Sequence, residues 1–482
     1  MSLLILLFLP LFSALVLAIV GDKKFSYELN IIASAATFVA GVDLAVSVYL
    51  GGSMLVWDKY FFVDAFNVYL AVLTSFVSMT TAIFSRRYMK REREKGKVGH
   101  RSMRFYHAMF QLFIFAMLLC LLTNNIGVLW IAMELATLST VLLVSLYRTP
   151  GAIEAAWKYF ILCGVGIAQA LFGTVLLYFA AERVLGEGGD ALLWTNLAQY
   201  SDKLEPTILS LAFVFLMVGY GTKVGLAPLH NWLPDAHSEG PTPVSAVLSG
   251  LLLNIALYAL VRCKTIVDGA THTHHAGYIM MGFGLLSILV GAFSLLRQKD
   301  IKRLFSYSSI EHMGIATFAF GLGGTIATYG ALLHMLMHSL TKSSIFYSVG
   351  HASQMHSTQE IDKIKGLIKG NPYVGWGLVF GAMAIVGMPP FGIFISEFLI
   401  LTATMKDAPW VAPLLLLGLV VAFAAIFKKV QPMTGGPVPD YQKRLKVASV
   451  PVILHLVLVL AIGLYMPVFL NNWFYKAVEI LK

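Results

Sequence analysis

Long apolar stretches recur along the chain and are separated by short polar segments. A membrane-spanning helix needs about 20 consecutive apolar residues, which matches these stretches. A membrane β-barrel would instead alternate polar and apolar residues over segments of about ten residues. The pattern therefore predicts an all-α polytopic membrane protein with about 14 transmembrane helices. They are expected near residues 3–20, 28–50, 62–84, 105–122, 125–146, 155–180, 207–229, 243–263, 276–296, 304–323, 325–350, 374–400, 411–430 and 447–470.

The seventh and twelfth of these helices contain glycines and prolines that interrupt helical geometry. The seventh reads GTKVGLAPLHNWLPD from residue 221, and the twelfth reads VGMPPFGIFISEF from residue 386. A broken helix is tolerated at membrane depth only where it is buried in protein or lines a water-filled cavity. We therefore interpret both broken helices, 7 and 12, as parts of an ion path.

The two breaks lie five helices apart, and interrupted helices in corresponding positions are typical of inverted repeats. The spacing predicts two inverted five-helix repeats, at residues 105–263 and 276–430. N-terminal helices 1–3 and a basic cytoplasmic loop form residues 1–104 in this interpretation. A loop and C-terminal helix 14 form residues 431–482.

The distribution of Lys and Arg predicts the orientation. When successive helices alternate in direction, most of the 35 Lys and Arg residues fall in loops on one side of the membrane. Basic loops face the cytoplasm, so both termini are expected outside, and the chain is expected in a prokaryotic inner membrane. The basic segment 86–104 is interpreted as a solvated anchoring loop, with docking of a soluble partner as the alternative.

Composition agrees with this class of protein. The chain of 482 residues is 58% hydrophobic and 12% charged, which excludes an ordinary soluble domain. A net charge of +10 is explained by loops that face anionic lipid, without invoking nucleic acid. Cys120, Cys163 and Cys263 fit no metal spacing and no disulfide framework. The segment 3–20 lacks a basic leader and a cleavage site, so it is expected to remain as a helix.

Two charged residues fall inside expected spans of the first repeat. Lys223 lies at the break in helix 7, and Glu134 lies in the middle of helix 5. A charge at mid-membrane costs about 2.5–3.5 kcal/mol, so each should face the protein interior. Lys223 is the expected partner of Glu134. Either the two residues form a structural ion pair, or they form a proton site in which the glutamate tunes the lysine.

Helix 11 carries three titratable residues at i, i+4 and i+8, which are His334, His338 and Lys342. This spacing puts them on one helical face, as a proton relay would require. Packing histidines and a zinc site are the alternatives, but no His-Glu-x-x-His pattern and no third ligand are evident. His312 is expected to extend the row, and Glu311 is a weaker candidate expected near an interface.

Several further polar residues are candidates for the same path. Glu397, just after the break in helix 12, is interpreted as a terminal exit gate or as a helix-end carboxylate near headgroup water. The polar segment 234–243 is interpreted as a short loop that gates or funnels the path. Three histidines of an outside loop, at positions 272, 274 and 275, could bind a metal, but a solvated loop is favoured. The secondary candidates are His230, Asp235, His237, Ser249, Asn254 and Glu311.

Several long motifs together resemble the proton-conducting antiporter-like subunits of respiratory complex I, Mrp cation/proton antiporters and group 4 membrane-bound hydrogenases. The likeness covers most of the chain and looks strongest toward component F of the hydrogenase-4 and formate hydrogenlyase type. The motifs are KVGLAPLHNWLPDAHSEGPTPVSAVLSG from residue 223, LLLNIALYALVR from 251, IEHMG from 310, HMLMHSLTK from 334 and GMPPFGIFISEF from 387, together with Glu134.

The resemblance implies a fold of fourteen helices with two inverted repeats. It also implies that Glu134 and Lys223 form the first-half pair, that the row on helix 11 is the central relay, and that Glu397 is the terminal site. Related complex I subunits often carry Lys or His in helix 8, where Ser249 and Asn254 stand here, so water or His312 would have to connect the halves. The long lateral helix of the largest relative is missing.

We therefore predict an ion-translocating subunit, for protons or sodium, of a redox-driven complex. This chain is expected to hold no cofactor and no metal of its own. A nickel-iron centre, iron–sulfur clusters or flavin are expected in partner subunits. The expected partners are other integral membrane subunits and a peripheral electron-transfer arm, with no nucleic acid. An Mrp-type cation/proton antiporter is the alternative, and a static scaffold is disfavoured because buried charges are costly.

Overall fold

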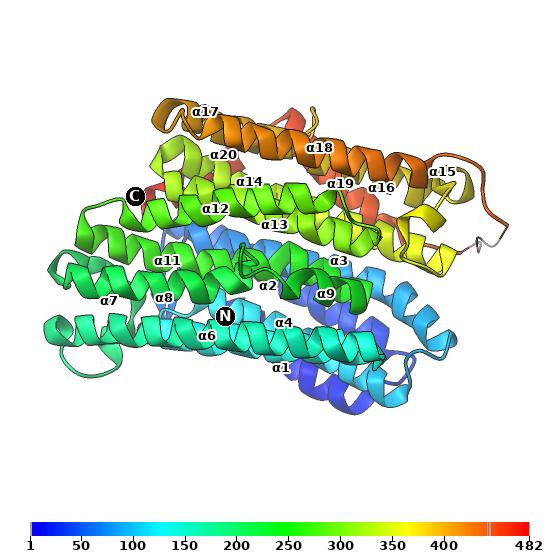
Figure 1. The fold of residues 1–482 in the computed structure, drawn as a ribbon. Coiled ribbons are helices and arrows are strands. Elements are labelled where there is room, and N and C mark those ends of the chain that lie inside the picture. Colours follow the sequence, from blue (N-terminus) through cyan, green and yellow to red (C-terminus); the bar gives the residue numbers. More distant parts are fainter. Residues whose placement is uncertain (1, 441, 443–444, 482) are drawn as a thin grey trace.

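The computed structural model describes residues 2–440, 442 and 445–481, and the chain is almost entirely helical (Figure 1). The predicted all-α polytopic class is thereby confirmed. The α-helices are α1 (Ser2–Val20), α2 (Ser26–Gly51), α3 (Ala65–Glu94), α4 (His100–Leu122), α5 (Ile126–Val144), α6 (Pro150–Leu185), α7 (Trp194–Gln199), α8 (Pro206–Val224), α9 (Trp232–Glu239), α10 (Thr242–Val247), α11 (Leu253–Thr271), α12 (His275–Leu295), α13 (Ile301–Leu322), α14 (Gly324–His356), α15 (Leu367–Gly370), α16 (Pro372–Ile385), α17 (Gly392–Asp407), α18 (Ala412–Thr434), α19 (Ser449–Leu464) and α20 (Val468–Ile480).

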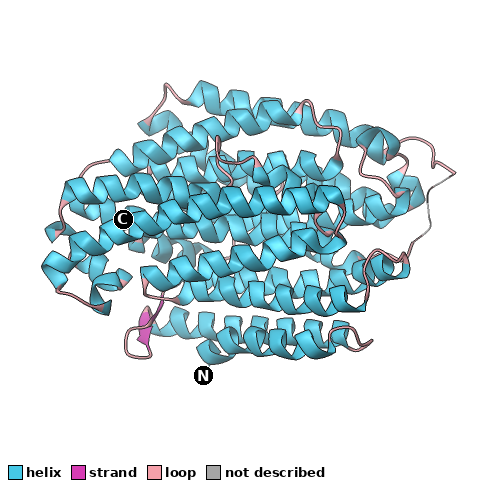
Figure 2. Cartoon of the chain, turned by 60° about the horizontal axis from the view of Figure 1, so that its bottom comes forward, coloured by secondary structure: helices cyan, strands magenta, loops and turns pink. Residues whose placement is uncertain are grey.

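Shorter elements complete the chain. A two-stranded antiparallel hairpin, β1 (Met54–Val56) and β2 (Phe61–Val63), lies at one end of the bundle (Figure 2). The sequence analysis did not predict this hairpin. The 3₁₀ turns are η1 (Ser145–Tyr147), η2 (Gly189–Leu192), η3 (Ser201–Lys203) and η5 (Ile361–Lys363), and η4 (Leu248–Leu252) is a π-helical segment.

Large exposed side chains of the bundle are mainly apolar, whereas many polar side chains lie inside among a mostly apolar core. Helices α6 and α18, near opposite edges of the bundle in Figure 1, expose large apolar side chains such as Val165 and Val420. The helical stretch Thr242–Thr271, by contrast, is completely buried at its most apolar part. Helices α13 and α14 also bury most of their residues, including many Ser, Thr and His. The polar residues that matter for chemistry therefore lie on central helices.

Ten helices of the described residues are long and apolar enough to cross a membrane, or eleven if the bent pair α19 and α20 counts as one span. Helices α13 and α14 are long as well, with 22 and 33 residues, but their buried polar side chains lower their hydropathy. Helices α16 and α17 flank a break and have 14 and 16 residues. The count of fourteen and the inverted repeats stay predictions.

Both predicted helix breaks are present. Helix α8 ends at Val224, where Gly225 adopts φ +80° and closes the helix in a left-handed cap. Helices α16 and α17 are separated by residues 386–391, where Gly387 has φ +68°. A cis peptide precedes Pro228 in the first break and Pro390 in the second. Each break therefore falls next to a charged residue singled out in the sequence, Lys223 or Glu397.

The segment 234–243 is not the polar loop that we expected. It forms helix α9 and the start of α10, and most of its side chains are buried. The stacked rings of Trp232 and Tyr159, with centroids 4.4 Å apart, fasten α9 to α6. The indole of Trp232 also donates a 2.8 Å hydrogen bond to the carbonyl of Thr222 at the end of α8. Tertiary packing therefore makes this turn-rich segment a buried helix that is attached to α6 and to the end of α8.

A buried ion pair joins the N-terminal helices to the first predicted repeat. Arg262 of α11 donates to the carboxylate of Asp64 at 2.6 Å, and both side chains are at most 3% exposed. The guanidinium also lies 4.3 Å from the ring centre of Trp194 and 5.2 Å from that of Phe66. Since Asp64 also caps α3, this pair holds the start of α3 against α11.

Helices α12 and α13 are in backbone contact through glycines. A Cβ on Gly284 would lie 2.6 Å from the amide nitrogen of Phe318 and 2.7 Å from the carbonyl oxygen of Gly314. Gly277 and Gly321 face each other in the same way. Close approach on small residues is a common basis of helix association in membranes. It places α13, with His312, firmly against α12.

We predict that Gly284→Leu destabilises the protein, because its new side chain meets backbone atoms that cannot move aside. Overpacking of this kind costs about 1–3 kcal/mol or more. Gly282→Leu is the matched control, since a Cβ there meets nothing within 4 Å. The measurement is the apparent melting temperature in detergent by fluorescence-detected size exclusion. Equal melting temperatures for the two variants would contradict the packing account.

Candidate functional site

The row on α14 lies in the interior of the bundle. His334, His338 and Lys342 are each at most 1% exposed. The ammonium of Lys342 donates to the backbone carbonyl of Phe305 at 2.9 Å and lies 5.7 Å from the ring centre of the same residue. Neither ring nitrogen of His338 has a hydrogen-bond partner among the described residues. Lys342 and His338 therefore have few fixed partners, as groups that exchange protons through water would.

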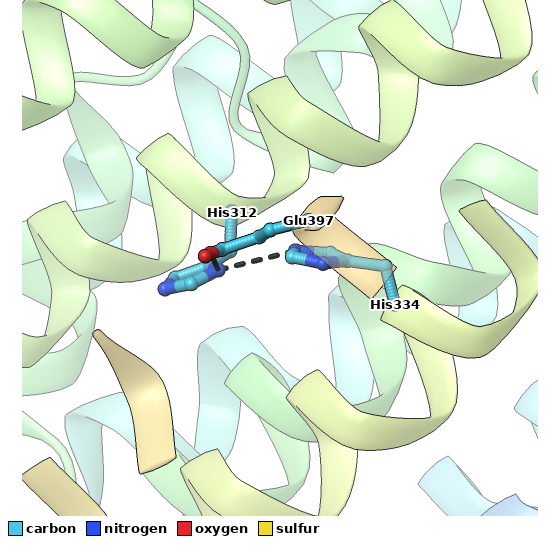
Figure 3. Close-up of side chains that lie close together, drawn as sticks. All are labelled: His312, His334 and Glu397. Atoms are coloured by element: carbon cyan, nitrogen blue, oxygen red, sulfur yellow. Dashed lines mark hydrogen bonds and ion pairs between the residues drawn. The ribbon is translucent and has the colours of Figure 1, made fainter. Parts of the chain in front are cut away.

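One end of the row is a three-residue cluster drawn from three helices (Figure 3). Nδ1 of His312 on α13 lies 3.1 Å from Nε2 of His334, and their ring centres are 5.1 Å apart. A carboxylate oxygen of Glu397 on α17 lies 4.0 Å from the same Nδ1 of His312. The ring centres of His338 and His312 are 5.7 Å apart. His338 therefore connects the cluster to the rest of the row on α14.

Helix α17 supplies two neighbouring residues to this cluster. Ser396 shares a 2.9 Å hydrogen bond with Nδ1 of His334, and Glu397 approaches His312. The break before α17 makes room for the second contact, because a Cβ on Gly387 would lie 2.0 Å from an oxygen of Glu397. Sequence reasoning found Glu397 but missed Ser396, since a serine inside a span carries no charge to mark it.

Glu311 lies midway along α13, 2% exposed, rather than near an interface as expected. One of its carboxylate oxygens is buried without a hydrogen-bond partner among the described residues. Its backbone packs against Gly291 of α12, where a Cβ would lie 2.9 Å from its amide nitrogen. Glu311 is therefore a buried acid of the row rather than a residue at the membrane surface.

The first-half pair forms as expected. The ammonium of Lys223 lies 3.8 Å from a carboxylate oxygen of Glu134, with the lysine fully buried and the glutamate 23% exposed. Lys223 also donates a hydrogen bond to the hydroxyl of Thr137, one turn along α5 from Glu134. Its ammonium lies 6.0 Å from the ring centre of Tyr159, so α5, α6 and α8 all contact the charge.

Polar residues of η4 and α11 supply hydroxyl and amide contacts to α13 and α14. Ser249 on η4 shares a 2.7 Å hydrogen bond with Ser309 of α13. Asn254 of α11 donates to the hydroxyl of Ser339 at 2.7 Å and to the carbonyl of Met335 at 3.1 Å. These contacts tie the π-helical turn to α13 and α14. None of these side chains titrates, so a proton crossing here would need water.

Among the secondary site candidates, His230 and His237 are buried, whereas Asp235 is partly exposed. His237 on α9 is 0% exposed, stacks on Phe346 with ring centres 5.1 Å apart, and has no hydrogen-bond partner for either ring nitrogen among the described residues. His230 is 8% exposed. Asp235 pairs with Lys158 at 3.1 Å and with Arg303 at 3.0 Å. The carboxylate of Asp235 therefore links α9 to both α6 and α13 through ion pairs. A carboxylate held in this way does not match the gating role expected for this segment.

A buried lysine that the sequence analysis assigned to a loop is Lys302. It is 2% exposed and donates to the carbonyls of Gly240 at 2.8 Å and Ser238 at 3.3 Å. It lines a cleft of about 280 Å³ together with Glu92, a second buried residue not singled out in the sequence. The Asp300 N-cap of α13 would have signalled that the helix begins at residue 301 and includes Lys302.

The three histidines of the outside loop, His272, His274 and His275, are exposed. Only one group of at least three potential metal ligands converges within the described residues, and it is His312, His334 and Glu397. The loop histidines are thus not gathered into a metal site. The converging group contains His334 but not His338, and its other two members, His312 and Glu397, come from α13 and α17.

Sequence comparison places the chain among membrane subunits of respiratory and antiporter complexes. The family described as NADH:quinone oxidoreductase/Mrp antiporter, TM, matches residues 123–424. The chain is 47% identical over 474 residues to the hydrogenase-4 component F homolog of Methylacidiphilum infernorum (isolate V4), covering 98% of each chain. It is 28% identical over 447 residues to NADH-quinone oxidoreductase subunit N of Desulforudis audaxviator (strain MP104C), covering 90% of this chain and 86% of that one.

Solved structures share the fold. A chain of the membrane-bound sulfane sulfur reductase, an archaeal respiratory membrane complex, has a TM-score of 0.89 at 24% identity, covering 99% of this chain and 97% of that one. A chain of the Mrp complex from Dietzia sp. DQ12-45-1b has a TM-score of 0.87 at 18% identity, covering 100% and 98%. A chain of respiratory complex I from Thermus thermophilus has a TM-score of 0.78 at 22% identity, covering 99% and 100%.

Gly387→Ala is predicted to push the carboxylate of Glu397 away from His312, because the new methyl group would occupy the place of a carboxylate oxygen. We expect proton uptake by vesicles that contain the variant to fall while assembly is retained. Gly324→Ala is the matched control, since Gly324 has φ +72° but open space around its Cβ position. Both variants carry the cost of alanine at positive φ, about 1 kcal/mol. Equal proton uptake in the two variants would show that the glutamate position does not matter.

Proposed function

Because the chain belongs to the NADH:quinone oxidoreductase/Mrp antiporter membrane family, we propose that it translocates protons along its buried titratable groups within a redox-driven complex. The family membership expected from the motifs is confirmed, and the chain is an antiporter-like membrane subunit of the hydrogenase-4, complex I and Mrp type. The residues that carry the ion and the complex that drives it belong to the proposal.

One observation carries the proposal. Lys342, His338, His312, His334 and Glu397 form a buried series in helices that a membrane protein could have built from apolar residues. Each intramembrane ionisable group raises the cost of insertion by about 2.5–3.5 kcal/mol if its charge is uncompensated. Packing of the helices alone does not require several ionisable side chains close to one another. A path for protons does require them, because each transfer needs a donor and an acceptor in reach.

The two halves have different roles in this proposal. Glu134 and Lys223 form the first-half site, in which the carboxylate at 3.8 Å stabilises the charged lysine. Lys342 receives the proton in the second half and passes it through the histidines toward Glu397. Ser249 and Asn254 hold the water that joins the halves, and His237, close to Phe346 of α14, borders that region.

Proton uptake from the basic side of the protein is proposed at the cleft of about 280 Å³ beside Glu92 and Lys302. The same cleft borders Lys97 of the basic loop, which pairs with Glu92 at 3.3 Å. By the positive-inside rule this side is cytoplasmic, and both termini are then outside. Glu397 lies at the opposite end of the second-half row and is proposed as the release site.

Electron transfer is proposed to occur in partner subunits that carry a nickel-iron centre, iron–sulfur clusters or flavin. The similarity to subunits of respiratory membrane complexes supports other integral membrane partners and a peripheral arm. The alternative is an Mrp-type monovalent cation/proton antiporter, which the shared fold with the Mrp complex also supports. Full-length similarity to a hydrogenase-4 component favours the redox-driven reading.

Lys223→Ala and Lys342→Ala are each predicted to reduce redox-driven proton pumping in inverted membrane vesicles to background. The reason is that each variant removes the buried lysine proposed to carry the proton in one half. Lys203→Ala, at an exposed position on η3, is the control and should pump normally. The measurement is quenching of a pH-sensitive dye, with assembly checked by native gel electrophoresis. Normal pumping by an assembled Lys342→Ala complex would remove the second-half path.

Purification is predicted to separate the two complexes. We expect the chain to co-migrate with proteins that contain nickel and iron–sulfur clusters, and vesicles to acidify only when an electron donor is supplied. Co-migration with small hydrophobic subunits alone, together with sodium exchange driven by an imposed pH gradient, would instead establish the antiporter alternative.

A further inference from the structure

We propose that His312, His334 and Glu397 bind one divalent transition-metal ion, with Zn²⁺ as the best match, and that the bound ion blocks proton transfer. The binding half of this proposal stands on the cluster geometry alone. The blocking half rests on the proposed function, since it assumes that protons pass through the same histidines.

The spacing of the three donor atoms suits a small ion. All three lie within 4.8 Å of one another, with 3.1 Å between the two imidazole nitrogens and 4.0 Å from Nδ1 of His312 to Glu397. In a tetrahedral zinc site with bonds of about 2.0–2.1 Å, neighbouring donors lie about 3.3–3.4 Å apart. Side-chain shifts of under about 1 Å would therefore close the site, with water as the fourth ligand.

Hydrogen bonding prepares one imidazole for a metal. The hydroxyl of Ser396 donates to the carbonyl of Ile393 at 2.8 Å, so its oxygen must accept from Nδ1–H of His334 at 2.9 Å. That bond fixes the proton on Nδ1 and leaves the lone pair of Nε2 facing His312. Metal-ligating histidines almost always have such a support on their second nitrogen.

Charge and donor type also favour this class of ion. One oxygen of Glu397 has no hydrogen-bond partner among the described residues, and neither has one oxygen of Glu311. As a ligand, the carboxylate of Glu397 compensates part of the charge of a dication that would otherwise be costly to bury. Two imidazoles with one carboxylate suit Zn²⁺, whereas Mg²⁺ and Ca²⁺ prefer oxygen ligands only.

Glu397 is the more exposed end of the site. Its side chain is 11% exposed, whereas that of His312 is 1% exposed. Once bound, the ion would occupy the lone pairs of His312 and His334 that a passing proton needs. The metal and the transferred proton therefore compete for the same two nitrogens.

The test uses the assembled membrane complex in detergent, with Zn²⁺ bound per complex measured by equilibrium dialysis. Metals held by partner subunits cancel when a variant is compared with the wild-type complex. All variants are built on a parent that carries His272→Ala, His274→Ala and His275→Ala, which removes the exposed loop histidines as a rival site, and the wild-type complex is measured beside that parent. Tetrahedral Co²⁺ absorption in the visible range provides a second, spectroscopic readout of the ligand set.

We expect Glu397→Gln and His334→Gln each to lose one Zn²⁺ per complex. Ser396→Ala should weaken binding about 10- to 100-fold, the usual effect of removing a supporting hydrogen bond. The matched control is His107→Gln, because His107 is also buried with neither ring nitrogen hydrogen-bonded among the described residues, but packs against Tyr27 and Tyr106. It should bind Zn²⁺ like the parent.

Unchanged zinc binding in the Glu397, His334 and Ser396 variants would overturn the proposal, as would binding lost only when the loop histidines are removed. Proton pumping is measured on vesicles reconstituted from the same preparations. Binding without inhibition would overturn the blocking half and leave the site. If the His334 variant pumps normally yet loses the ion, the proposed proton path fails and the metal site stands.

Discussion

A charge placed in the hydrocarbon core of a bilayer costs about 2.5–3.5 kcal/mol even on the lenient insertion scale. This constraint shapes the whole chain. The helices that carry Lys223, Lys342 and Glu311 are enclosed by more apolar ones, so that each charge meets protein rather than acyl chains. Outer helices such as α6 and α18 contribute apolar surface, and central helices such as α13 and α14 contribute chemistry. Apolar side chains on the outer helices thus separate the buried polar side chains from the acyl chains.

The broken helices follow from the same constraint. In lipid every backbone group must be hydrogen-bonded within the protein, so an interrupted helix is tolerated only where it is buried or lines a water-filled cavity. At the end of α8 the left-handed cap at Gly225 leaves Lys223 in the last turn, beside α5 and α6. At the second break, Gly387 leaves space for the carboxylate of Glu397. In both places, backbone irregularity is located where an ionisable group needs a partner from another helix.

The sequence predicted what depends on local pattern and charge. Apolar length identified the spans, glycine and proline identified both breaks, and helical spacing identified the row on α14. The sequence did not predict the features that depend on tertiary packing. The segment 234–243 reads as a turn, yet Trp232 and Tyr159 hold it as a buried helix. Ser396 could not be found because its role depends on His334, which is 62 residues away in the chain.

The two buried lysines differ in a way that bears on direction. Lys223 has a carboxylate at 3.8 Å and a threonine hydroxyl, so its charge is compensated within its own half. Lys342 has the backbone carbonyl and the aromatic ring of Phe305 as its direct contacts. Among the described residues, Lys223 therefore has a carboxylate partner within 4 Å, whereas the direct contacts of Lys342 are uncharged. In the proposed path, this difference suits Lys223 to keep its charge beside Glu134 and suits Lys342 to pass its proton on toward the histidines and Glu397.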